Sequence, residues 1–131
     1  MDLYRDFILD HYENPRNFGH LDHPTSVETL FNSACGDKLT IEVMIETKKP
    51  AGAVITDIRF TGQGCAISQA AASLLTEEVK GKAVSAVMAL PAGGMEKLLG
   101  TKLTASRVRC ATLPLEALQK ALVKTRGFRV R

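Results

Sequence analysis

The sequence predicts an α+β domain in which a small three-stranded antiparallel sheet is covered by helices. Two neighbouring stretches, 38–46 and 54–61, alternate apolar and polar residues, as half-buried strands do. Directly after Gly62-Gln63-Gly64 the apolar period changes to the helical one, and no further strand pattern follows. Strands that precede a run of helices are typical of the α+β class. With 131 residues and 45% hydrophobic content, we expect one domain over residues 1–131.

The first predicted element is a helix that Asp2 would cap and that ends at Asn14-Pro15. A short edge strand is expected next, over residues 26–33. The apolar positions of the helix recur every three or four residues: Leu3, Tyr4, Phe7, Ile8 and Tyr12.

The strand at 38–46 and the strand at 54–61 are joined by residues 48–52, which suit a hairpin loop. In the first strand the predicted inner face holds Leu39, Ile41, Val43 and Ile45. The second strand is predicted to have two faces, one with Val54, Thr56, Ile58 and Phe60 and the other with Ile55, Asp57, Arg59 and Thr61.

Helices are predicted over 66–80 and 83–90, with a further turn at 95–99 and a last helix that begins near Pro114. Gly81 follows the first of these in the position where glycine commonly ends a helix. The inward face of that helix is expected to hold Ile67, Ala70, Ala71, Leu74, Leu75 and Val79.

The composition argues against a nucleic-acid-binding or membrane protein. The net charge is +3, and the basic residues gather only near the end of the chain, which we interpret as a solvated tail or a dock for an acidic protein. No apolar run approaches the roughly 18 to 20 residues that a membrane helix needs. The first 20 residues lack the pattern of a signal peptide, so we expect a cytoplasmic protein.

Three cysteines, Cys35, Cys65 and Cys110, carry the chemistry that the sequence suggests. An odd number cannot pair fully within one chain, and a reducing compartment disfavours disulfides, so metal ligation is the better interpretation. Separations of 30 and 45 residues do not match a zinc finger, so the fold would have to assemble the site. Buried structural thiols are the alternative.

Each cysteine is predicted to lie beside a turn or a helix start. Cys35 precedes Gly36 and Asp37, whose carboxylate could point back to the thiol or merely cap the turn. Cys65 would begin a helix, whose positive end favours thiolate. Cys110 is expected at the entrance of the last helix, with Arg107 and Arg109 close by. Three histidines are interpreted as surface or packing residues: His11, His20 and His23.

Four sequence blocks together resemble the U-type iron–sulfur cluster assembly scaffolds, which include IscU, SufU and the N-terminal domain of NifU. The resemblance covers nearly the whole chain and implies a fold of the SufE/NifU type. The blocks, in order, are 11–17 (HYENPRN), 32–37 (NSACGD), 60–68 (FTGQGCAIS) and 109–114 (RCATLP).

The resemblance implies a site of Cys35, Asp37, Cys65 and Cys110, in which the three cysteines would also bind a [2Fe–2S] cluster. Three thiolates and one carboxylate suit Zn²⁺, and thiolates suit iron. The implied partners are a cysteine desulfurase of the SufS or IscS type, which supplies persulfide sulfur, and acceptor apoproteins. By analogy with SufU the persulfide acceptor is Cys35, and by analogy with IscU it is Cys110; we favour Cys35.

The sequence departs from both the IscU and the SufU pattern, which leaves the subfamily open. Arg109 stands where IscU has a histidine, and 103–107 replaces the string that an Hsp70-type chaperone recognises, so that partnership is not implied. The insertion of roughly twenty residues that is usual in SufU is also missing.

Three functions follow from the resemblance. The main one is a cluster assembly scaffold that accepts sulfur, rather than a turnover enzyme. The second is a zinc-dependent sulfurtransferase that activates a SufS-type desulfurase and holds no cluster. The third is a structural zinc module.

Overall fold

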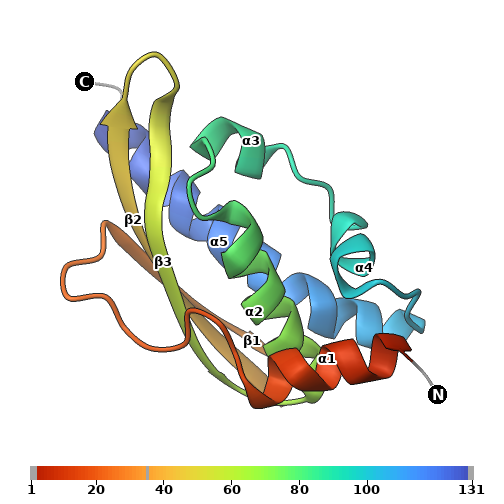
Figure 1. Ribbon diagram of the computed structural model, residues 1–131. Helices are drawn as coiled ribbons and strands as arrows, with labels where there is room; N and C mark the ends of the chain where they lie inside the picture. Colours follow the sequence, from red (N-terminus) through yellow and green to blue (C-terminus); the bar gives the residue numbers. More distant parts are fainter. Residues whose placement is uncertain (1–2, 35, 130–131) are drawn as a thin grey trace.

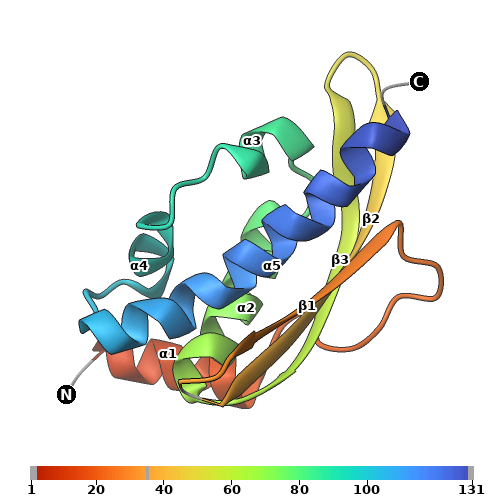
Figure 2. The same cartoon turned by 180° about the vertical axis from the view of Figure 1, so that it is seen from behind.

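The computed structural model describes residues 3–34 and 36–129 and has the predicted α+β architecture. Three antiparallel strands form one sheet in the order β1-β2-β3, and helices cover one of its faces (Figures 1 and 2). In chain order the elements are α1 (Leu3–Glu13), β1 (Ser26–Asn32), β2 (Asp37–Lys48), β3 (Gly52–Gln63), α2 (Ala66–Val79), α3 (Val84–Met88), α4 (Gly94–Leu99) and α5 (Ala105–Arg129).

The alternation predicted for the strands is confirmed in β2 and only partly in β3. Leu39, Ile41 and Val43 are fully buried against the helices. In β3, Ile55 was expected on the face opposite to that of Ile58, yet both side chains are fully buried. The reason is a β-bulge, because Met44 pairs with Asp57 while Ile45 pairs with Ile55, which leaves the residue between them without a partner and reverses the faces.

Helix α2 lies at the centre of the domain, between the sheet and α1. Ten of its 14 residues are buried, including every predicted inward residue except Ile67, which is half-buried. It ends as predicted, because Gly81 takes the left-handed conformation with φ 87°. The core joins three groups of apolar residues: Leu39, Ile41, Ile58 and Phe60 of the sheet, Ala71 and Leu75 of α2, and Leu118 and Leu122 of α5.

The prediction for the last helix was wrong at its start, because α5 begins at Ala105 and Pro114 lies inside it. Pro114 has no N–H to donate to the carbonyl group four residues earlier, that of Cys110. Apolar burial outweighs this loss, since Ala111, Leu115 and Leu118 all pack into the core. Cys110 therefore lies in the second turn of a helix and not at a helix entrance.

Helix α1 contacts α2 through a buried polar contact at His11. This contact confirms His11 as a packing residue. The Ser73 hydroxyl accepts the Arg16 backbone N–H at 2.9 Å and lies 2.8 Å from His11 Nδ1. A neutral imidazole suits this contact, since its Nδ1 can accept the Ser73 proton. Burial is the main cause that lowers the pKa of His11, with the Arg16 charge second. The Asp2 cap predicted for this helix lies outside the described residues.

Acidification is expected to destabilise the protein through His11. Its pKa in the fold is lowered from 6.5, so the unfolded chain binds the proton more readily, and stability falls as the pH drops below about 6.5. Urea denaturation between pH 7 and pH 5 measures the effect, with His11→Gln as the non-titrating control. Equal pH dependence in the two proteins would contradict the prediction.

Within residues 3–34 and 36–129, none of the helices has the length and apolar character that crossing a bilayer requires. The domain boundary predicted at 1–131 remains a prediction.

Candidate metal centre

Three of the four predicted ligand residues meet at one end of the sheet. Asp37 is the first residue of β2, Cys65 directly precedes α2, and Cys110 belongs to α5. One ligand atom from each lies within 4.8 Å of the others. The fourth predicted residue, Cys35, lies outside the described residues. Chain folding thus brings together side chains that are 28 and 45 residues apart, as the sequence analysis required.

Asp37 is held in place by the segment that leads into α2. Its side chain is buried, with 1% of the residue exposed. Oδ1 accepts the backbone N–H of Cys65 at 2.8 Å, and Oδ2 lies 3.7 Å from the Cys65 sulfur. One carboxylate oxygen therefore fixes the backbone while the other faces the thiol.

Gly64 makes this close approach possible. Its φ of +144° is one that side-chain-bearing residues rarely adopt, and a Cβ placed there would lie 2.0 Å from Asp37 Oδ1. A glycine directly before the second cysteine is therefore a steric requirement of the Asp37 position.

Cys65 is the N-cap residue of α2, which confirms its predicted place at a helix start. Its thiol is half-buried and also lies 3.9 Å from the Ser68 hydroxyl, which itself donates to the Cys65 carbonyl at 3.1 Å. The Cys65 sulfur therefore lies at the positive end of the α2 dipole.

Cys110 is fully buried, and the exposed Arg107 guanidinium lies beside both described thiols. The charge of Cys65, followed by a hydrogen bond to Cys110, raises the pKa of Arg107. Of the two arginines expected near Cys110, only Arg107 has this role, while Arg109 faces a separate groove. Residues two positions apart in a helix point in directions about 200° apart, which is why Arg107 and Arg109 face different surroundings.

The family described as the NifU-like N terminal domain matches residues 3–130. The chain belongs to this family.

One relative is the zinc-dependent sulfurtransferase SufU of Bacillus subtilis, which is 34% identical over 95% of this chain and 92% of its own length. The iron–sulfur cluster assembly scaffold protein IscU of Aquifex aeolicus is 36% identical over 91% of this chain and 73% of its own. A structure of a putative scaffold for the SUF system from Fervidobacterium islandicum superposes with a TM-score of 0.71 and 28% identity, covering 89% of this chain and 94% of that one.

The three described ligand atoms of this family member fit a tetrahedral metal. Around Zn²⁺ the ligand atoms of cysteine and carboxylate groups lie about 3.5 to 3.8 Å apart. The distance of 3.7 Å between Cys65 Sγ and Asp37 Oδ2 is already in that range, and the whole group spans no more than 4.8 Å. The donor set of two sulfurs and one carboxylate oxygen also suits iron.

Sequence reasoning missed the parts of the site that hold the ligands. Gly64 was recognised only as a break in the strand, and Ser68 was not singled out. The only signal for either was its place within four residues of Cys65. His11 contacts Ser73, and His20 lies 2.5 Å from Glu42, so both contact residues outside the centre.

Proposed function

We propose that this protein is an iron–sulfur cluster assembly scaffold that accepts persulfide sulfur from a cysteine desulfurase. The observation that carries the proposal is the convergence of Asp37, Cys65 and Cys110 within 4.8 Å. It occurs in a chain that shares 36% identity with an IscU scaffold protein and 34% with a SufU sulfurtransferase. Acceptor apoproteins would take the product, and a reducing cytoplasm suits a site built from cysteine thiols.

Cys35 is the fourth member of the proposed site. It lies two residues before Asp37 in sequence, and the intervening Gly36 has a φ of +72°, which bends the chain at that point. Bound Zn²⁺ or iron would keep these thiols deprotonated near neutral pH.

Cys35 is also the proposed persulfide acceptor. Its thiolate would attack the terminal sulfur of the desulfurase persulfide, so that one S–S bond forms as the donor's S–S bond breaks and the donor leaves as a thiolate. No net oxidation occurs, because the terminal sulfur keeps its proton and becomes the outer sulfur of the new Cys35 persulfide. The other candidate, Cys110, is fully buried in this conformation, which disfavours attack on a protein-bound persulfide.

Sulfur uptake is expected to require Cys35. When the protein is mixed with a desulfurase and cysteine, a labelled thiol trap should detect persulfide on the wild type and at least about tenfold less on Cys35→Ala. Ser85→Ala, at an exposed position of α3, is the control. Normal sulfur uptake by Cys35→Ala would refute the assignment of the acceptor.

A zinc-dependent sulfurtransferase that holds no cluster is the second candidate. It is favoured by the match to SufU over 92% of that protein's length. Anaerobic reconstitution separates the two functions, because a scaffold should gain a visible chromophore that depends on iron and sulfide and survives desalting. Tightly bound zinc, faster desulfurase turnover and no chromophore would favour the sulfurtransferase. Unfolding on zinc removal without any effect on the desulfurase would favour a structural zinc module.

A further inference from the structure

One buried amide next to the metal centre has no hydrogen-bond partner in the described structure. Gln69 is the fourth residue of α2, four positions after Cys65, and is 8% exposed. Its Nε2 is fully buried and finds no acceptor among the residues that the structure describes. Buried amide donors are nearly always paired, because an unpaired one costs free energy. An unpaired donor at this place indicates that an acceptor joins it in another state of the centre.

Gln69 and Asp37 lie on the same face of the sheet, each close to a glycine. A Cβ at Gly62 would lie 3.1 Å from Gln69 Nε2. A Cβ at Gly64 would lie 2.0 Å from Asp37 Oδ1. Gly62 pairs with Leu39, which is buried beneath the helices together with Asp37, two residues before it. Positions two residues apart in a strand lie about 6 to 7 Å from each other, and neither glycine places a side chain between the amide and the carboxylate.

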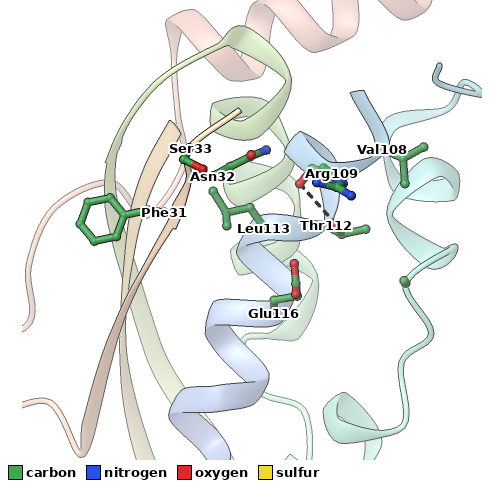
Figure 3. Close-up of a pocket in the computed structure, with 9 residues that line it drawn as sticks. Phe31, Asn32, Ser33, Val108, Arg109, Thr112, Leu113 and Glu116 are labelled. Atoms are coloured by element: carbon green, nitrogen blue, oxygen red, sulfur yellow. Dashed lines mark hydrogen bonds between the residues drawn. The ribbon is translucent and has the colours of Figure 1, made fainter. Parts of the chain in front are cut away.

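The acceptor for this amide has to come from the metal centre. Solvent does not reach Nε2, and Gln69 does not line the open groove that Arg109 borders between β1 and α5 (Figure 3). Among the described ligand groups the Asp37 carboxylate is the strongest acceptor, since a sulfur accepts only weakly. Its Oδ1 accepts the Cys65 backbone N–H, while Oδ2 faces the Cys65 thiol. Oδ2 can accept the amide proton once it no longer faces the thiol.

Asp37 is also the ligand that the metal should release most easily. Thiolates are soft ligands that suit Zn²⁺ and iron, whereas carboxylate oxygens suit harder ions such as Mg²⁺ and Ca²⁺. In a set of Cys65, Cys110 and Asp37 the carboxylate is therefore the weakest match. A carboxylate that leaves the metal inside a buried site needs a hydrogen-bond donor, because an unpaired buried charge is costly.

We infer that Gln69 holds the Asp37 carboxylate when that carboxylate leaves the metal, which makes Asp37 the exchangeable ligand of the centre. Oδ1 keeps the Cys65 N–H in this exchange, and Oδ2 turns from the thiol to Gln69 Nε2. Gln69 is a positioning residue, because it acts on the metal only through Asp37. The inference rests on the proposed function, since it assigns the step by which the same centre releases its metal or its cluster.

The rate of zinc release into an excess of a chromophoric chelator tests the inference. Gln69→Leu removes the donor at similar size, so zinc release should be about tenfold slower, as expected when one hydrogen bond to a charged group is lost. Gln69→Met has an unbranched side chain like that of glutamine and should give the same result. It is the second variant, in case leucine disturbs the core.

Gln119→Leu is the matched control for these substitutions. Gln119 lies on α5, and its Nε2 donates to the Val87 and Leu90 carbonyl groups at 3.2 Å each. Its replacement removes hydrogen bonds that the fold already makes, so the thermal unfolding midpoint should fall. Zinc release should stay within about twofold of the wild-type rate, because the lost hydrogen bonds do not involve a ligand.

Combination with Asp37→Asn shows whether the amide acts through Asp37. In that background Gln69→Leu should change the rate of zinc release by less than about twofold. A slowing of the same size that persists there would assign the amide to another ligand and overturn the inference. Wild-type release rates in both Gln69 variants, with normal sulfur uptake, would overturn it and leave the proposed function standing. Faster release would show that the amide orients a bound ligand, which would also overturn it. A wild type that neither binds zinc nor accepts sulfur would overturn both proposals.

Discussion

Replacing Gly64 with alanine is expected to destroy the metal centre without touching any ligand. The new Cβ would lie 2.0 Å from Asp37 Oδ1, so the carboxylate has to move away from the Cys65 backbone and from the two thiols. The backbone conformation at φ +144° adds a destabilisation of about 1–3 kcal/mol. Zinc affinity should fall by about 100-fold, the upper end of what the loss of a group that orients ligands costs. Competition with a chromophoric chelator measures the affinity, and urea denaturation of the metal-free protein measures the stability.

Gly93→Ala is the matched control for this substitution. Gly93 has a helical φ of −64°, and no atom lies within 4 Å of the position where its Cβ would be. Alanine there should leave zinc affinity unchanged and should be neutral, or stabilising by up to about 1 kcal/mol. If Gly64→Ala bound zinc as tightly as Gly93→Ala, the steric link between Gly64 and Asp37 would be wrong.

The sheet and the central helix could be predicted because their residues repeat with clear periods. Alternation located β2 and β3, and the change of period after Gly64 located α2. The face of Ile55 could not be predicted in the same way, because a single bulged residue shifts the pairing without leaving a mark in the hydrophobic pattern.

The start of α5 was mispredicted because Pro114 is also a favourable first-turn residue. Local sequence preference cannot show that the apolar residues on both sides of Pro114 pack against the same core, which stabilises one continuous helix. The error extended to the site, since it placed Cys110 at a helix start and gave Arg107 and Arg109 the same role.

The ligand set was more predictable than its support. Asp37 and Cys65 belong to two short sequence blocks, and the family resemblance of those blocks implied a shared site; the structure places the two residues together. The contacts that hold them depend on the backbone path at Gly64 and on the end of β2, neither of which has a sequence period.

Asp37 is expected to have two separable roles, one for each carboxylate oxygen. Oδ1 accepts the Cys65 backbone N–H at 2.8 Å, and Oδ2 faces the thiol at 3.7 Å. Asparagine can keep an acceptor at the first position, but its neutral amide is a poor zinc ligand. Asp37→Asn should therefore retain the stability of the metal-free protein while zinc affinity falls by more than about 100-fold, because the loss of a ligand should cost more than the loss of a group that orients one.

Asp37→Ala should lose both roles. The partly buried Cys65 N–H then loses its acceptor, which costs about 1–3 kcal/mol in addition to the loss of zinc affinity. Asp57→Asn is the matched control. The Asp57 carboxylate pairs with Arg59 in β3 and with Lys80 at the end of α2, away from the metal centre. Zinc affinity should therefore not change. Chelator competition and urea denaturation of the three variants give the two quantities independently. Wild-type zinc affinity in Asp37→Asn would remove Asp37 from the ligand set, and equal destabilisation by asparagine and alanine would show that Oδ1 does not stabilise the turn before α2.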